Sequence, residues 1–308
     1  MHSLNSKIAK YTTKLFLVIF LCSLNYSCIR DNLDDCGKSS SVILKVVDVI
    51  TGEDITTLGE MDIAELYLFD ENQQYIRKIT VNAEDILEKR PIQIFKLNPE
   101  KVRISVWGNR RDNQSLTELE SPNSTLQNSK IELLTDKGYA IPPDDLFFGF
   151  HELKEDDEVK EIAVSRKNAL MHITVRGLQQ GNDDDYYFII KMNNNGYDFR
   201  GIPGPPSAQM MQSGIYNANG DFITPEAFKL IHAQQTVTDH MTVSIYKRAQ
   251  SSSEADELIS TAYMDINGNP ISPPAGYTTN ILFDIEDPDG PTIQVELTPW
   301  KEIYQWGE

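Results

Sequence analysis

The sequence predicts an all-β protein with two tandem antiparallel β-sandwich domains. Short runs in which apolar and polar residues alternate recur along the chain, and a period of two is typical of half-buried strands. Asn219-Gly220 and Asn267-Gly268 are dipeptides favoured in tight turns. Helical segments do not alternate with the strands, which disfavours a doubly wound parallel sheet. The one predicted helix is Pro225–Gln235, with proline at its first position.

The predicted N-terminal sandwich covers residues 42–160. Its clearest strand is Lys101–Trp107, in which Val102, Ile104 and Val106 share one face. Arg110–Asn128 is polar and without a clear period, so we expect a long loop there. The other predicted strands are Val42–Val49, Ile63–Phe69, Tyr75–Val81, Pro91–Leu97 and Leu146–Phe150.

The predicted C-terminal sandwich covers residues 161–308. A charged stretch, His151–Glu161, precedes it and suggests a boundary near residues 155–165. In Ala169–Arg176 the apolar residues again alternate, with Met171 and Ile173 facing inward. The further predicted strands are Tyr186–Met192, Met241–Lys247, Leu258–Met264, Thr279–Ile285 and Thr292–Leu297.

Composition excludes several classes of protein. The chain has 308 residues, enough for about two domains. It carries 46 acidic and 28 basic residues, a formal charge of −18, so nucleic acid is a poor partner because the electrostatic interaction would be repulsive. Three cysteines and five histidines leave little material for a disulfide scaffold or a zinc site.

The N-terminus has the features of a secretory signal peptide. Lys7, Lys10 and Lys14 form a basic region, and the apolar run Leu15–Leu24 follows. Ten helical residues rise only about 15 Å, which is half the thickness of a bilayer core, so the run is too short to span it. The sequence therefore predicts an exported protein whose signal peptide is residues 1–27.

Cys28 is the predicted site of lipidation. A small residue, Ser27, directly precedes it, and the apolar run ends three residues earlier at Leu24, which is the pattern of a bacterial lipoprotein signal. The consensus leucine three residues before the cysteine is replaced by Asn25, so the match is loose. Cleavage and acylation, with chains such as palmitate, would leave 281 residues with a formal charge of −21. Buried acyl chains hold a protein on a membrane at about 0.8 kcal/mol per methylene.

Two alternatives stay open for this segment. Ordinary signal peptidase could cleave near Ser27 without lipid, or Cys22 could be the acylated residue, although the bulky Leu21 before it argues against that. If Cys28 is acylated, Cys36 has no partner and no disulfide forms within the mature chain. Residues 28–41 then form an acidic tether, whose aspartates resemble the surface-export signal of lipoproteins in Bacteroidota.

No motif of a known catalytic site occurs. The phosphate-binding loop, the nucleophile elbow and the zinc-protease helix motif are all absent. His172 is predicted on the outward face of its strand, and we interpret all four mature histidines (His151, His172, His232 and His240) as surface or rim residues. Asp284–Gly290 lacks the residue order of a calcium loop, so a polar turn is the better interpretation. We expect no enzyme activity, no cofactor and no metal.

Four motifs together resemble one family. These are the segment from Cys28 to Cys36, the Trp-Gly-Asn motif at Trp107, the aromatic strand Asp145–Gly149, and Arg166–Leu178, which opens the second domain. In order and spacing they resemble the FimB/Mfa-type fimbrial anchor lipoproteins of Bacteroidota, which belong to type V pili. The resemblance covers residues 28–178, and beyond it only the β pattern and the length agree.

The resemblance implies two transthyretin-like β-sandwiches and a fimbrial anchor or assembly subunit. Lipid on Cys28 would fix one end in the outer membrane, and a strand edge or groove would dock a pilin subunit. The implied location is the cell surface and the fimbrium. The alternative is a surface glycan-binding lipoprotein that stacks sugars on Tyr186, Tyr187 and Trp300. The motif aromatics and glycines are interpreted as packing residues, so Cys28 is the one predicted functional residue.

The last segment of the chain is unusually aromatic. Thr292–Leu297 alternates, and Pro299 follows it. Trp300, Tyr304 and Trp306 lie within the last nine residues, where termini are normally polar and poorly ordered. Two interpretations remain open: the aromatics pack over the end of the second sandwich, or the segment also helps to form the joint with a fimbrial subunit.

Overall fold

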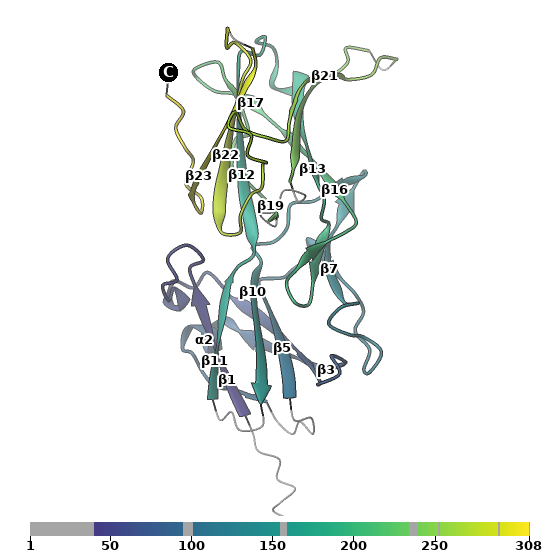
Figure 1. Ribbon diagram of the computed structural model, residues 1–308, viewed down its shortest axis with the longest axis vertical. Coiled ribbons are helices and arrows are strands. Elements are labelled where there is room, and N and C mark those ends of the chain that lie inside the picture. Colours follow the sequence, from purple (N-terminus) through teal and green to yellow (C-terminus); the bar gives the residue numbers. More distant parts are fainter. Residues whose placement is uncertain are drawn as a thin grey trace, which may run out of the picture. The chain divides into compact units, whose positions relative to one another are not determined.

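The computed structural model describes residues 40–94, 101–154, 159–233, 240–251, 253–288 and 290–307. The prediction of an all-β protein is confirmed, because the described elements are almost all strands (Figure 1). The described helical elements are the short α2 (Ala83–Leu87) and two 3₁₀ turns, η2 (Thr56–Leu58) and η3 (Asp183–Asp185). No helix in this part of the chain is long and apolar enough to cross a bilayer.

The first sheet has seven strands and is mostly antiparallel. Its strands, in sheet order, are β3 (Tyr75–Asn82), β2 (Ile63–Phe69), β5 (Lys101–Gly108), β10 (Phe147–Lys154), β11 (Val159–Arg166), β1 (Ser40–Val47) and β4 (Ile92–Ile94). The exception is β1, which runs parallel to β11 with Ser41 to Val47 opposite Val159 to Ser165. The strands predicted from alternation are confirmed here, and β1 begins two residues before the predicted start of the domain.

The family motifs in this sheet are packing residues, as predicted. Trp107 and Phe147 are fully buried. A Cβ on Gly149 would lie 2.6 Å from the carbonyl oxygen of Ala163, and one on Gly108 would collide with the side chain of Met61. Glycine is therefore needed at both positions because neighbouring atoms lie too close for a side chain, and not because of an unusual φ.

Two further sheets enclose the core of the C-terminal half. One has the order β17 (Ile215–Tyr216), β18 (Phe222–Ile223), β12 (Asn168–Arg176), β22 (Tyr277–Asp284) and β23 (Thr292–Pro299), and β19 (Phe228–Ile231) also pairs with β12. The other has the order β16 (Ala208–Ser213), β13 (Tyr186–Met192), β20 (Thr242–Lys247) and β21 (Glu257–Ala262). Ile173, Phe188, Val243 and Ile281 are buried in one shared core.

A smaller sheet joins strands from the two predicted domains. Its order is β15 (Pro203–Gly204), β14 (Gly196–Asp198), β7 (Lys130–Leu133) and β6 (Gln114–Leu116), and a two-stranded hairpin, β8 (Thr135–Asp136) and β9 (Tyr139–Ala140), follows β7 in the chain. The core cluster likewise extends from Tyr67 to Phe283. The described residues belong to one compact unit, and the division into two domains stays a prediction.

The boundary predicted between residues 160 and 161 lies inside β11, a strand of the first sheet. The described parts of the charged stretch His151–Glu161 are the end of β10 and the start of β11. The chain leaves the first sheet at Lys167, between β11 and β12.

The predicted helix Pro225–Gln235 is wrong. Its described part contains β19, in which Phe228 and Leu230 are buried and Leu230 lies opposite Ala169 of β12. Short apolar runs do not distinguish a helix from a buried strand, and pairing with β12 decides the outcome here. The predicted turns at Gly220 and Gly268 are confirmed, since both glycines have positive φ.

Candidate docking edge at the C-terminal strand

β23 forms one edge of its sheet. It pairs along its whole length with β22, from Tyr277 opposite Pro299 to Asp284 opposite Thr292. Among the described residues it pairs with no strand on its other side, where the main-chain nitrogen of Ile266 donates to the carbonyl oxygen of Ile293 at 2.7 Å. Leu297 is 48% exposed. An edge of this kind presents main-chain donors and acceptors to another chain.

Residues 300–307 follow β23 and lie against the outer face of the same sheet. Thr278 and Asn280 of β22 are fully buried there and bind main-chain nitrogens of this segment. Thr278 Oγ1 accepts from Lys301 N at 3.1 Å, and Asn280 Oδ1 accepts from Tyr304 N at 3.0 Å. In Figure 1 this segment is the yellow stretch that runs from β23 to the point marked C. We call β23 and residues 300–307 together the C-terminal edge.

Two arginines hold the ends of residues 300–307. The guanidinium carbon of Arg166 lies 4.3 Å from the centre of the Trp300 ring, a cation–π contact. Arg176 Nη2 donates to the carbonyl oxygen of Gly307 at 3.2 Å. Trp300 therefore packs against Arg166 at the end of β11, a strand of the first sheet, and packing of the terminal aromatics over the end of the second sandwich stays a prediction. Thr292–Leu297 lies in β23, as predicted.

The packing of this segment leaves two donors unsatisfied. The indole nitrogens of Trp300 and Trp306 are buried and have no hydrogen-bond partner among the described residues. A buried donor without a partner costs about 1–3 kcal/mol. Tyr304, between them in sequence, is 41% exposed. The segment is thus held on its own sheet with two buried donors that have no partner among the described residues, and Tyr304 is its half-exposed aromatic.

The predicted site residues have different outcomes. Cys28 lies outside the described residues, as do Cys22 and Cys36. Tyr186 and Tyr187 are only 3% and 7% exposed, and Trp300 stacks on Arg166, so the three aromatics named for glycan stacking do not form an exposed platform. Within the described residues, no three His, Cys, Asp or Glu side chains are placed to hold a metal ion.

The prediction that His172 faces solvent is wrong. His172 is 5% exposed, because it lies opposite Asn280 on the sheet face that also binds residues 300–307. Burial lowers the pKa of His172, and burial lowers that of the half-buried His232 to about 3. Alternation identified the two faces of β12 correctly, but it could not show that both are covered.

The fold and the C-terminal edge define an all-β protein with an open strand edge, and comparisons with known proteins identify its family. Residues 33–306 match the family described as fimbrillin-A associated anchor proteins Mfa1 and Mfa2. The chain belongs to this family, which confirms the resemblance found in the sequence.

Individual proteins are also similar to this chain in sequence or in fold. The chain is 23% identical to the major fimbrium anchoring subunit FimB of Porphyromonas gingivalis strain W83, over 95% of this chain and 96% of the relative. The fold is similar to that of the fimbrial anchor protein Mfa2 of P. gingivalis, with a TM-score of 0.62, 15% identity, and coverage of 85% and 98% of the two chains. It is also similar to a Bacteroides thetaiotaomicron protein whose proposed role is polysaccharide binding, with a TM-score of 0.65, 14% identity, and coverage of 87% and 98%.

Proposed function

We propose that this protein is an anchor subunit that attaches a fimbrium to the outer membrane. Lipid on Cys28 holds its N-terminus in the membrane, and the C-terminal edge docks a fimbrial subunit by β-strand addition. The observation that carries the proposal is the match of residues 33–306 to a family of fimbrial anchor proteins. The relative FimB is named as an anchoring subunit of the major fimbrium, which supports a fimbrial partner for this chain.

The lipid part of the proposal rests on the sequence around Cys28. The apolar run Leu15–Leu24, which is too short to span a bilayer, ends four residues before this cysteine, and the small Ser27 directly precedes it. A mature chain with a formal charge of −21 has no electrostatic attraction for an anionic membrane surface. Acyl chains therefore supply the attachment, and the acidic tether of residues 28–41 leads away from the membrane.

The docking part rests on the open side of β23. A partner strand added there would gain main-chain hydrogen bonds, and the half-exposed Leu297 would pack against its side chains. Tyr304 in the adjoining segment is 41% exposed and offers a further contact to a partner. Main-chain hydrogen bonds at a strand edge do not depend on the side chains of the partner. Specificity for a fimbrial subunit would therefore come from contacts of apolar side chains such as Leu297.

Replacing Cys28 tests the lipid anchor. Cys28→Ala should move the protein from the outer-membrane fraction to the soluble fraction, while Cys36→Ala, the matched control, should leave it membrane-bound. Flotation in a density gradient, with intact mass to detect the acyl chains, measures both. A Cys28→Ala protein that still floats with outer membranes would show that the anchor lies elsewhere.

A pair of leucines tests the docking edge. Leu297 on β23 and Leu258 on β21 have almost equal exposure, 48% and 50%, and both lie on edge strands. Leu297→Lys should cause cells to shed fimbriae into the medium, because a buried ammonium at the joint lacks a partner. Leu258→Lys should not. Shedding with the second variant and not the first would contradict docking at β23.

A further inference from the structure

A wide polar pocket lies at one end of the sheet formed by β16, β13 and β20. Its volume is about 710 Å³, within the usual range of about 300–1,000 Å³ for sites that hold small ligands. The β8–β9 hairpin contributes Thr135, Gly138 and Ala140 to its wall. This pocket is separate from the C-terminal edge, since none of its lining residues comes from β23 or residues 300–307.

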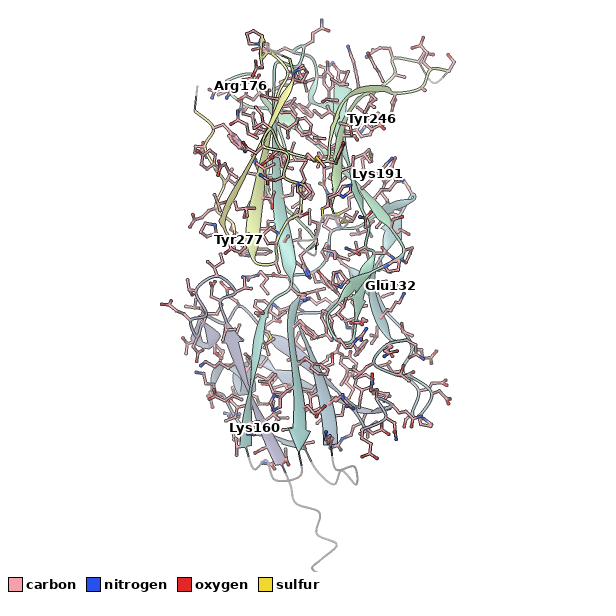
Figure 2. The ribbon with its side chains drawn as sticks, in the orientation of Figure 1. Glu132, Lys160, Arg176, Lys191, Tyr246 and Tyr277 are labelled. Atoms are coloured by element: carbon pink, nitrogen blue, oxygen red, sulfur yellow. The ribbon has the colours of Figure 1, made fainter. Side chains whose placement is uncertain are left out.

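The strand register builds a polar row across the pocket. Lys191 of β13 lies opposite Gln209 of β16 on one side and opposite Thr242 of β20 on the other. Paired residues in neighbouring strands point to the same face, so an amide, an ammonium and a hydroxyl stand side by side. All three line the pocket, and Figure 2 shows Lys191 on this sheet.

Further polar groups come from the loops at the strand ends. Asn193 and Asn195 follow β13, and His240 precedes β20. Asn193 Nδ2 donates to the carbonyl oxygen of His240 at 3.4 Å, which ties the two loops together. The side-chain oxygen of Asn195 is buried and has no hydrogen-bond partner among the described residues.

The charge of this pocket differs from that of the whole chain. Acidic residues outnumber basic ones by 46 to 28 in the sequence, yet none of the residues that line the pocket carries a carboxylate. Its ionisable lining groups are the ammonium of Lys191 and the imidazole of His240. The lining also lacks a Phe, Tyr or Trp ring on which a sugar could stack. Recognition must therefore come from hydrogen bonds and from one fixed positive charge.

We propose that this pocket binds a saccharide that carries a carboxylate, such as a sialic or uronic acid residue. The ammonium of Lys191 pairs with the ligand carboxylate, an interaction stronger than a neutral hydrogen bond. The amides of Gln209 and Asn193 offer both donors and acceptors, which match sugar hydroxyls that also do both. The protein would then bind a surface glycan by a route independent of its fimbrial joint.

Binding of matched sugars to the detergent-solubilised full-length protein tests the proposal. The probes are 3′-sialyllactose with lactose, and trigalacturonate with its neutral trimethyl ester, titrated by calorimetry. We expect at least one acidic sugar to bind about ten-fold or more tightly than its neutral counterpart, the factor expected from one charge-assisted hydrogen bond. Equal binding within both pairs, or no binding of either acidic sugar, would overturn the proposal.

Variants locate the binding. Lys191→Gln should weaken binding of the acidic sugar about ten-fold, and Lys191→Arg should retain most of it. The control is Lys45→Gln, which removes the same charge from β1 in the first sheet. An unchanged affinity in Lys191→Gln, or an equal loss in the control, would place the ligand elsewhere. The tripeptide Ala-Ala-Ala is included because its terminal carboxylate could also pair with Lys191, and tighter binding of this peptide than of both acidic sugars would refute the saccharide assignment.

Discussion

The phenol of the buried Tyr197 and the imidazole of the half-buried His232 form a pair in which Tyr197 Oη lies 3.1 Å from His232 Nδ1. Their rings stack, with centres 5.5 Å apart and an angle of 16° between the planes. Tyr197 Oη also lies 3.1 Å from the carbonyl oxygen of Lys167, to which it donates. The pair therefore connects β14, the residue after β19 and the crossing point between β11 and β12.

This pair predicts an acid-sensitive contribution to stability. Burial is the main reason that the pKa of His232 falls to about 3, from an ordinary value near 6.5. Between these values the unfolded chain binds a proton that the folded chain does not, so stability falls as pH decreases from about 6.5 to 3. Urea unfolding measures this effect in the wild type and in His232→Gln at pH 7, 6, 5 and 4. As the pH falls, the free energy of unfolding of the wild type should decrease relative to that of His232→Gln, by at most about 1.4 kcal/mol per pH unit. A difference in free energy of unfolding that stays constant from pH 7 to 4 would contradict the lowered pKa of His232.

Lys167 predicts an effect of the same sign at alkaline pH. Burial lowers its pKa to about 8, and the carboxylate of Asp198 acts in the opposite direction. From pH 8 to about 10.4 the unfolded chain keeps a proton that the folded chain has lost, so stability rises with pH in this window. Relative to Lys167→Met, the wild-type protein should gain free energy of unfolding between pH 8 and 10, with no change in the difference from pH 6 to 7.5. Parallel curves above pH 8 would show that Lys167 titrates normally.

Arg166 should be the most costly of the ion-paired arginines to remove. Its guanidinium binds Asp145 at 2.8 Å and Glu60 at 2.7 Å and also contacts the ring of Phe147. Because the arginine is buried, Arg166→Ala should lower the free energy of unfolding by about 3 kcal/mol. The control is Arg111→Ala, whose exposed ion pair with Asp62 should contribute at most about 1 kcal/mol. Similar losses in both variants, measured by urea unfolding, would disprove this ranking.

Truncation separates the two roles of residues 300–307. Deleting residues 300–308 removes two half-buried indoles and uncovers Thr278 and Asn280, so we expect a loss of about 3 kcal/mol. Fimbriae should also be shed at a temperature where the truncated protein is still folded and membrane-bound. Deleting residues 307–308 alone is the control and should change neither property strongly. A truncated protein that is fully stable and retains fimbriae would refute both roles.

Much of the fold could be predicted from alternation alone. The bounds of β2 and β13 match the predicted strands Ile63–Phe69 and Tyr186–Met192, because each strand is apolar and flanked by polar turns. The segment Pro225–Gln235 failed because its strand depends on pairing with β12, more than 50 residues earlier in the chain. Local sequence does not encode such a partner.

The candidate sites were less predictable. The edge strand Thr292–Leu297 and the terminal aromatics were evident, since both are unusual for a chain terminus. The role of Asn280 was not, because its partner is a main-chain nitrogen of Tyr304 and carries no residue-type signal. The polar pocket was missed for a similar reason: Gln209, Lys191 and Thr242 become neighbours only through the register of three strands.

The parallel pairing of β1 and β11 has a mechanical consequence. The last two residues of the proposed tether, Ser40 and Ser41, are already part of β1, so under the proposed anchoring tension between a membrane and a fimbrium would enter the folded part of the chain at Ser40. When the pull acts along β1, the inter-strand hydrogen bonds that link Ser41–Val47 to β11 are loaded in shear together, and they do not open one after another. β4 adds antiparallel pairs to Ser40–Val42, at the point where the load enters. Under the proposed anchoring, the pairing of β1 with β11 and β4 would thus resist extraction of this strand from its sheet.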